Sequence, residues 1–329
     1  MPLTDSGSLT YERRASVRIE GEDNSSVSLY EVGNGIYRAD QLALRQDSRY
    51  RLHIISSTGK EFISDFVSPK RTPPIDTLTW QREADGIDLY INTHDPQNNT
   101  RYYKWEYDET WEFNSTYFAS LKYVYNSLGF IIGIDTTSLV EFHAMYTCWA
   151  SESSKRMLIG SSARLSQDTI NQELLNIPNS SWKFTVLYSI NVRQYALTKE
   201  GYEYLQLIKK NTEQTGGLFD AQPSQLRGNI RCVTDTTEPV VGFIEISDAQ
   251  EKRFFIRRSD VNPWPYSQGC TRYSVPNNAD TLNKIQEDWI PSTVHEYGQF
   301  GEIKRFWVST PECVDCRTRG TSEKPSFWP

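Results

Sequence analysis

The acidic residues closest to an enzymatic arrangement lie in one short stretch, KWEYDETWEF. Glu106, Asp108 and Glu112 alternate there. On a β-strand they would share one face with Lys104. Paired carboxylates hydrolyse glycosides or bind calcium, but a glycosidase needs its acid and base on opposite sides of a cleft. We therefore interpret this row as a solvated outer face, with a hydrolase as the alternative.

The four histidines predict no metal site, because none belongs to an HExxH motif and no two are spaced at i and i+4. His94 with Asp95 is retained as an alternative acid–base pair. The chain contains no GxSxG nucleophile motif and no papain-type cysteine context. The sequence therefore predicts no catalytic residue, no metal ligand and no cofactor. The histidines are His53, His94, His143 and His295.

Five cysteines leave at least one free thiol if the others pair. CVDC at residues 313–316 has the spacing of half a zinc site, but no second CxxC supplies the other ligands. It also lacks the strand-to-helix context of a thioredoxin-like motif. We interpret this pair as a structural disulfide or buried thiols, and Cys148 as a buried cysteine.

Two aromatic residues, Trp264 and Tyr266, lie between prolines in NPWPYSQGC, where a regular central strand cannot form. Rigid loop aromatics of this kind stack on sugars or anchor a protein partner. They also cover the end of a β-sandwich, which we favour because most tryptophans are largely buried. They remain the candidate ligand or partner contacts.

Composition favours a β-rich protein, since aromatic residues make up 13% of the 329 residues and suit pleated surfaces. The formal charge of −7 argues against nucleic acid, which needs clustered Lys and Arg. The longest strongly apolar run, LGFIIGI at residues 128–134, is far shorter than the roughly 20 residues of a membrane-spanning helix. The first residues lack the apolar core of a secretory leader, which predicts a cytoplasmic protein or an exported one whose leader has been removed.

Short alternating segments predict an immunoglobulin-like or transthyretin-like β-sandwich over residues 1–72. Only about five strands are visible, so we expect an open edge or missing first strands. Three prolines in SPKRTPPID, residues 68–76, mark a domain boundary. Residues 73–329 are then a larger β-sandwich domain with an inserted α-helix. The five segments are SVRIEG, SVSLYEV, GIYRAD, YRLHIIS and KEFISDFV.

Several segments of the larger domain alternate strictly. Ile87, Leu89 and Ile91 would share one face of a strand. The longest strand is predicted in KFTVLYSINVRQYAL, residues 183–197. We also expect VVGFIEIS and KRFFIRR to form a hairpin that turns at residues 248–251.

One helix is predicted near residues 198–213, where Thr198 can cap the N-terminus and Glu200 favours the first turn. A weaker helix is predicted over residues 166–176. In that segment Ile170, Leu174 and Leu175 would face inward.

The connector TEQTGGLFDAQPSQLRGNIRC, residues 212–232, contains neither a Walker loop nor a dinucleotide loop. Gly216 and Gly217 suit a helix C-terminus, and Pro223 prevents the helix from resuming. We interpret the segment as a structural connector in preference to a ligand-binding loop. Its apolar residues Leu218, Phe219 and Leu226 would plug the core.

Four segments carry a family resemblance: LTKEGYEYLQLIKKNTEQTGGLFDAQPSQLRGNI, PVVGFIEIS with KRFFIRR, TPPIDTLTW, and the ending CVDCRTRGTSEKPSFWP. In this combination and order, the chain resembles the Bacteroidota lipoproteins grouped as domain of unknown function 4249. The resemblance runs from about residue 15 to residue 329.

The resemblance implies an exported protein that a lipidated N-terminal cysteine anchors to the outer membrane at the cell surface. Such proteins are often encoded beside a TonB-dependent transporter, which implies a non-enzymatic accessory in nutrient uptake. The expected partners are that transporter and a glycan or peptide ligand, with membrane contact only through the anchor. This sequence shows neither the leader nor the anchor cysteine. A carbohydrate-binding adhesion module or a carbohydrate-active hydrolase is the alternative.

Export also changes what is expected of the cysteines. In an oxidising compartment, Cys270 would pair with Cys313 or Cys316 and hold the C-terminal tail to the NPWPYSQGC loop. Alternatively, Cys313 and Cys316 would pair with each other.

Overall fold

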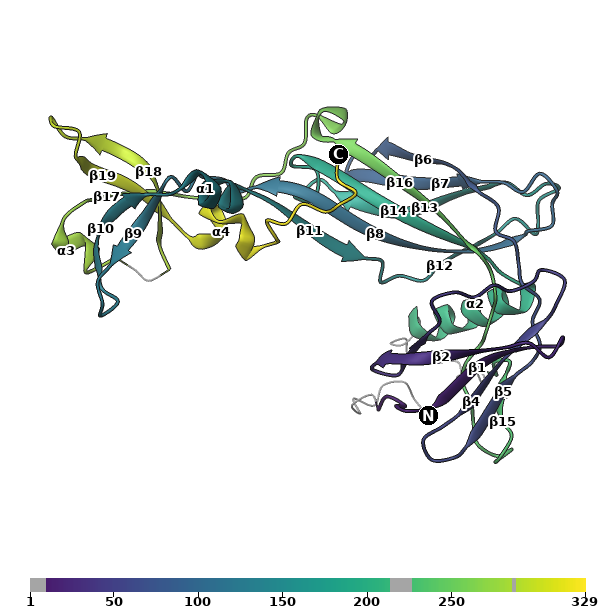
Figure 1. Cartoon of the computed structure of the whole chain (residues 1–329). Coiled ribbons are helices and arrows are strands. Elements are labelled where there is room, and N and C mark those ends of the chain that lie inside the picture. The colour runs from purple at the N-terminus through teal and green to yellow at the C-terminus, as the bar shows by residue number, and fades with distance from the viewer. Residues whose placement is uncertain (1–9, 214–226, 286–287) are drawn as a thin grey trace, which may run out of the picture.

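The computed structural model describes residues 10–213, 227–285 and 288–329. It is mainly β, as predicted, with 44% of residues in strands, and its named strands pair antiparallel throughout. Figure 1 shows three parts, which we call the N-terminal sheet, the central sandwich and the distal module. The N-terminal sheet and the distal module lie at opposite ends of the central sandwich (Figure 1).

The N-terminal sheet has six strands in the order β15-β5-β4-β1-β2-β3. The first five end before the predicted boundary at residue 72, and β15 joins them from far along the chain by pairing with β5. The sixth strand of this sheet therefore comes from the segment that follows the long helix. The strands are β1 Ser16–Gly21, β2 Ser26–Gly33, β3 Ile36–Arg38, β4 Tyr50–Ile55, β5 Glu61–Ser64 and β15 Ile230–Cys232.

The central sandwich packs a sheet in the order β11-β8-β14-β16, with β12 also paired to β8, against a second sheet in the order β13-β7-β6. Ile87, Leu89 and Ile91 of β7 are buried in the core between the sheets, as their alternation predicts. The strands are β6 Ile75–Arg82, β7 Gly86–Thr93, β8 Tyr102–Asn114, β11 Thr147–Ser153, β12 Leu158–Ser161, β13 Ile170–Pro178, β14 Leu187–Ala196 and β16 Ala249–Arg257.

Strand β8 runs the length of the larger sheet and alternates between two kinds of side chain. The side chains of its inward row are all buried, and all of them except Glu109 are aromatic. The Glu109 carboxylate accepts hydrogen bonds from Lys183 Nζ and the Tyr188 hydroxyl, each at 2.8 Å. Burial, followed by the charge of Glu109, raises the pKa of Tyr188. The buried carboxylate is therefore fully engaged in structural contacts. The aromatic members are Tyr103, Trp105, Tyr107, Trp111 and Phe113.

The predicted helix is confirmed as α2, Lys199–Glu213. Thr198 caps it, because its side-chain oxygen accepts a hydrogen bond of 3.0 Å from the backbone N–H of Gly201. Thr198 in turn donates its backbone N–H to Glu245 at 3.0 Å. The start of α2 is thus fixed to the segment that precedes β16.

The expected hairpin of VVGFIEIS with KRFFIRR is wrong. Strand β16 pairs with β14 instead, and residues 240–246 form no strand. Asn229 holds that segment by donating its side-chain amide to Ile244 O at 2.9 Å and accepting from Ile244 N at 2.8 Å. The segment lies along α2, where the rings of Phe243 and Tyr204 stack with their centroids 5.1 Å apart. Contacts distant in sequence replace the local pairing.

The weaker helix predicted over residues 166–176 is also wrong, because β13 begins at Ile170 and pairs with β7. A register shift between Glu173 and Leu175 is the physical reason. This β-bulge allows Leu174 and Leu175 to face inward together, and with Ile170 they imitate helical spacing.

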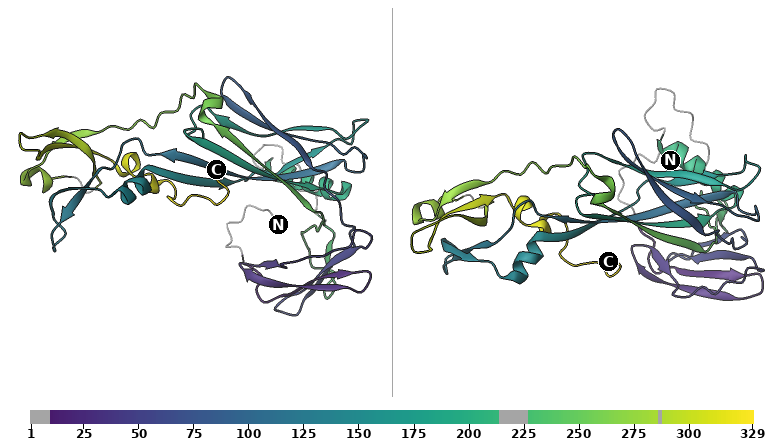
Figure 2. Two further views of the ribbon diagram at one scale, coloured as in Figure 1. Left: turned by 45° about the horizontal axis from the view of Figure 1, so that its top comes forward. Right: turned by 90° about the horizontal axis from the view of Figure 1, so that it is seen from above.

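The distal module combines the insertion between β8 and β11 with the chain over residues 273–314, and a narrow neck separates it from the sandwich in both views of Figure 2. One sheet is the hairpin β9–β10, and the other has the order β17-β19-β18. The elements are β9 Leu121–Tyr125, β10 Ile131–Thr136, α1 Leu139–Tyr146, β17 Tyr273–Pro276, α3 Ala279–Leu282, β18 Ile290–Tyr297, β19 Ile303–Ser309 and α4 Pro311–Val314. Short 3-10 turns lie at Arg258–Val261 and Cys316–Thr318.

The paired glycines, Pro223 and the predicted plugs Leu218, Phe219 and Leu226 lie outside the described residues. Gly228, the third glycine of the connector, is described and has a packing role. A Cβ on Gly228 would lie 1.5 Å from the backbone oxygen of Gly242. Only glycine permits the two backbones to approach this closely.

Replacement of Gly228 by Ala is expected to lower the free energy of unfolding by about 1–3 kcal/mol, because the added methyl displaces backbone atoms. Thermal and urea unfolding of the whole chain measure the effect. Gly133→Ala is the matched control, since a Cβ there has no neighbour within 4 Å. Equal stability of the two variants would show that the close approach at Gly228 is unimportant.

Candidate docking surface on the distal module

The three candidate carboxylates lie on the outer face of β8 and bind neighbouring side chains. Glu106 contacts Lys104 Nζ at 2.7 Å, Asp108 contacts Arg193 at 2.7 Å, and Glu112 accepts from Trp328 Nε1 at 2.8 Å. Partial burial raises the pKa of Glu106, but the hydrogen bond and charge of Lys104 leave it below its ordinary value. These contacts favour a structural outer face over a glycosidase pair, which needs a proton held near neutral pH.

His94 and Asp95 do not act together as an acid–base pair, because each side chain contacts other groups. His94 Nδ1 contacts Asp76 at 2.7 Å, and the hydrogen bond to Asp76 raises its pKa. Asp95 instead accepts the backbone N–H groups of Gln97, Asn99 and Thr100 at 2.8–2.9 Å. Asp95 is therefore occupied in organising a turn.

Trp264 is buried, and its indole N–H donates to Ser181 O at 2.7 Å. Tyr266 is half-buried and packs against the same core. The two side chains cover the end of the sandwich, which agrees with the interpretation that we favoured. Trp264 offers no open ring face to a ligand.

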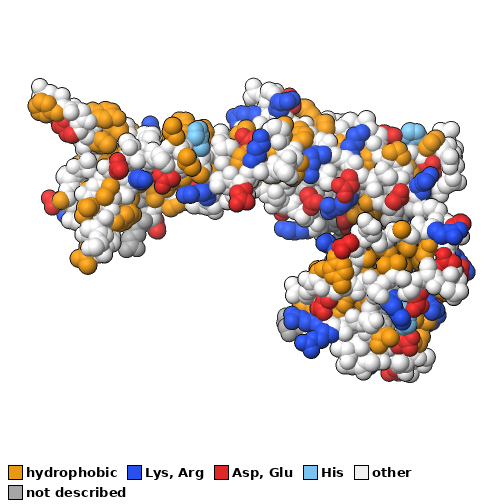
Figure 3. Space-filling model, in the orientation of Figure 1, with side chains coloured by type: hydrophobic (Ala, Val, Ile, Leu, Met, Phe, Trp, Pro, Cys, Tyr) orange, Lys and Arg blue, Asp and Glu red, His pale blue; other side chains and the backbone are white. Residues whose placement is uncertain are grey.

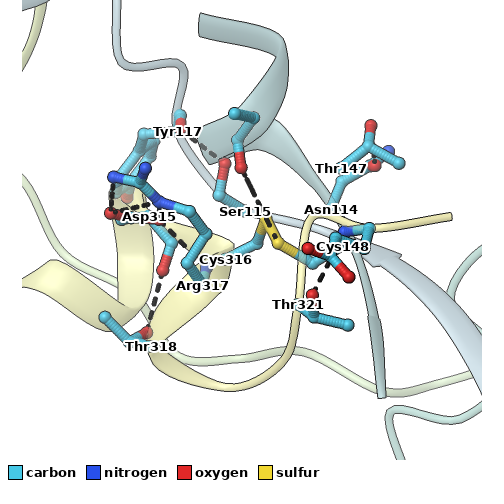
Figure 4. Close-up of a disulfide and its surroundings, with 12 residues drawn as sticks. Asn114, Ser115, Tyr117, Thr147, Cys148, Asp315, Cys316, Arg317, Thr318 and Thr321 are labelled. Carbon is cyan, nitrogen blue, oxygen red and sulfur yellow. Dashed lines mark hydrogen bonds and ion pairs between the residues drawn. A yellow bond between two sulfur atoms is a disulfide. The ribbon is translucent and has the colours of Figure 1, made fainter. Parts of the chain in front are cut away.

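Two disulfides lie at the neck. Cys270 pairs with Cys313 and Cys148 pairs with Cys316, so the two cysteines of CVDC have different partners. Figure 4 shows the second bridge, which connects the start of β11 to the C-terminal tail. Cys148 is thus buried but not a free thiol. Cys232 is a buried free thiol.

Beyond the neck, the C-terminal tail returns along the central sandwich. Thr321 and Trp149 exchange backbone hydrogen bonds of 2.8 and 2.9 Å. Trp328 is buried, and its ring meets Phe255 edge-on at 5.5 Å. The tail therefore pairs with β11 near the base of the distal module and packs against β16 of the same sheet.

The most apolar run of the chain, residues 128–134, lies on the surface of the distal module. Leu128, Phe130 and Ile132 are 78%, 62% and 60% exposed. Ile131 and Ile134 face the opposite way and pack against a small core around Phe306. The hairpin β9–β10 thus covers the module with one face and presents apolar side chains on the other.

A tight turn fixes the end of this hairpin. Asn126 Oδ1 accepts the backbone N–H groups of Leu128 and Phe130, both at 3.0 Å. Gly129 has a φ of +84°, which favours glycine. The exposed side chains are therefore held by an ordered turn.

Helix α1 extends the apolar surface. Ser138 and Glu141 form a capping box, and Lys122 of β9 binds Glu141 at 3.1 Å. Lys122, followed by Ser138, lowers the pKa of Glu141 by hydrogen bonding. Leu139 and Val140 in the first turn are nevertheless 76% and 80% exposed, and none of the helix residues is buried.

A second apolar tip lies at the turn between β18 and β19. Phe300 is 91% exposed, and Tyr297 is also exposed. Glu302 accepts the backbone N–H of Phe300 at 3.0 Å, which organises the turn. Figure 3 shows hydrophobic side chains gathered at both outer ends of the distal module.

We call the exposed apolar side chains of β9–β10, α1 and the β18–β19 turn the docking surface. Of the twenty large hydrophobic side chains that are exposed among the described residues, eleven belong to the distal module. Exposed single hydrophobics are ordinarily scattered, so this concentration makes the distal module the candidate interaction site. The docking surface consists of Val124, Tyr125, Leu128, Phe130, Ile132, Leu139, Val140, Tyr297 and Phe300.

A family model described as a domain of unknown function, DUF4249, matches residues 2–253. The chain belongs to this family. The match covers the N-terminal sheet, the hairpin with α1 and the central sandwich as far as residue 253, where it ends within β16. Comparisons with curated proteins and with solved structures give no match.

The described residues of this DUF4249 chain contain no cluster of three or more His, Cys, Asp or Glu suited to a metal ion. Among the helices in the described ranges, none combines the length and apolar character needed to span a bilayer. The exposed apolar side chains of the docking surface are suited to contact with another apolar surface.

The sequence contained one signal for the docking surface, the apolar run itself. Between Tyr123 and Val140 the only charged residue is Asp135. Hydrophobicity alone favours a buried strand, and only the structure shows that one face of the hairpin is enough to cover the small core behind it.

Peptide mass mapping of the purified chain, carried out without a reducing agent, is expected to recover two linked pairs, Cys148 with Cys316 and Cys270 with Cys313. Cys232 is expected to react with an alkylating reagent only after unfolding, because it is 3% exposed. A peptide in which Cys313 is linked to Cys316 would contradict the arrangement of the neck.

Proposed function

We propose that this DUF4249 chain is an exported, non-enzymatic accessory protein that docks on a TonB-dependent outer-membrane transporter and assists nutrient uptake. In this proposal it is a Bacteroidota lipoprotein of the cell surface, attached to the outer membrane only through a lipid at its N-terminus. The partner binds at the docking surface of the distal module.

The observation that carries the proposal is the exposure of the run at residues 128–134. Burial of a Leu, Ile or Phe side chain stabilises a fold by roughly 1.5–3 kcal/mol, and this chain leaves Leu128, Phe130 and Ile132 in solvent. A partner that covers them recovers that free energy on binding.

Two disulfides support export, because such bonds form and persist in oxidising compartments. Both bonds lie at the neck, so they also hold the distal module in place relative to the sandwich. A rigid module loses little conformational entropy when it binds.

The charges near the docking surface favour a protein partner over an anionic membrane surface. Binding to anionic lipid needs a group of Lys or Arg. Here Lys122 is neutralised by Glu141, and Asp135 is exposed beside them. An apolar groove on the outer side of a transporter is the complementary surface.

The layout in Figure 1 supports an anchored docking protein. An anchor at the N-terminus would lie at the end of the sandwich away from the docking surface. The sandwich then acts as a spacer that presents the distal module to a neighbouring protein.

The test is capture of a transporter from native outer membranes by the purified chain. The amount of transporter that the variant Phe130→Ser/Ile132→Ser recovers is expected to fall by about tenfold or more, because two apolar contacts are lost. Ile36→Ser is the matched control, because Ile36 on the N-terminal sheet is 58% exposed and Ile132 is 60% exposed.

Failure to recover any outer-membrane protein with the wild-type chain would refute the proposal. An equal loss with Ile36→Ser would move the contact away from the distal module. Circular dichroism of each variant should match that of the wild type, because the substituted side chains are exposed.

A further inference from the structure

A second surface of the distal module differs from the docking surface in its chemistry. On the sheet β17-β19-β18, three basic side chains surround Trp307: Arg272, Arg305 and His295. We propose that this face binds the carboxylate groups of an acidic polysaccharide, a polymer of uronate sugars.

Arg272 is exposed, yet aromatic rings hold its guanidinium in place. The guanidinium lies 4.4 Å from the ring centre of Trp307 and 5.3 Å from that of Tyr117. The Tyr117 hydroxyl is itself fixed by a 2.8 Å hydrogen bond to Cys270 O. A guanidinium held flat in this way keeps its N–H groups available for a planar acceptor such as a carboxylate.

Arg305 and His295 meet at one hydroxyl group. Arg305 donates Nε to Ser274 Oγ and Nη2 to Ser274 O, both at 2.9 Å. His295 Nδ1 lies 2.5 Å from the same Oγ, and its ring lies 4.3 Å from that of Trp307. Within the part of the chain that the structure describes, Arg305 Nη1 and His295 Nε2 have no hydrogen-bond partner.

None of the three basic groups forms an ion pair with an acidic residue in the described ranges of the chain. Glu296 stands opposite Arg305 in the strand register but does not bind it. Local positive charge therefore remains on a protein whose net charge is −7. A ligand that supplies carboxylates completes the site.

Trp307 favours a sugar acid over anions that contain no sugar ring. Its side chain is only partly buried, so part of the indole remains open beside Arg272. A pyranose ring contacts the part of the indole that Arg272 and His295 leave exposed, while the uronate carboxylate takes the guanidinium fork. An acidic peptide offers carboxylates without such a ring.

The whole purified chain is titrated with oligogalacturonate and, separately, with a neutral malto-oligosaccharide of the same length. Calorimetry measures the binding in each titration. Oligogalacturonate is expected to bind and the neutral sugar is not. Arg272→Gln is expected to weaken binding by about tenfold or more, because a charge-assisted bidentate contact is lost. Lys304→Gln, on the same strand as Arg305, is the control and should bind as the wild type does.

Trp307→Phe is expected to weaken binding of the sugar acid severalfold. Unchanged thermal midpoints show that the variants remain folded. Absence of oligogalacturonate binding, equal losses with Lys304→Gln, or equally tight binding of oligoglutamate would each overturn the proposal. Phe130→Ser/Ile132→Ser should retain sugar binding, so failure here is distinct from failure of transporter docking.

Discussion

The two-residue alternation of β8 is the constraint on which the other parts of the structure depend. One face of this strand carries the aromatic row that fills the sandwich, and the other carries charged side chains. Its 13 residues pair with β11, β12 and β14, so a slip of one residue would turn Trp105 outward and Glu106 into the core. Such a slip would bury a charge and expose an aromatic ring together. The register is therefore strongly fixed.

The same strand sets the position of the distal module. Its end at Asn114 leads directly into the insertion, and β11 returns beside it from Thr147. Cys148 then connects this return to Cys316, while the tail crosses at Thr321. The neck is thus an extension of the sheet, and the rigidity of the sandwich passes to the docking surface through paired backbone and a covalent bond.

Local patterns in the sequence predicted the elements whose cause is local. The alternation of Ile87, Leu89 and Ile91 and the cap at Thr198 were both confirmed. The errors arose where distant contacts decide. β16 pairs with β14 in place of its sequence neighbour, and a bulge in β13 brings Leu174 and Leu175 to one face. Glu109 lies in the inward row of β8, and its partner Lys183 is far along the chain, so only folding brings the two together.

The exposure of the docking surface could not be predicted from a sequence pattern. In β10 the inward residues Ile131 and Ile134 are sufficient to pack the hairpin on the core of the module. Folding makes no demand that Ile132, on the other face, be apolar, and a polar residue there would lower the tendency to aggregate. The exposed side chains of Leu128, Phe130 and Ile132 therefore need a reason other than stability of the fold. The proposed contact with a partner would supply that reason. Because several such side chains lie on one small module, a single accidental substitution does not explain them.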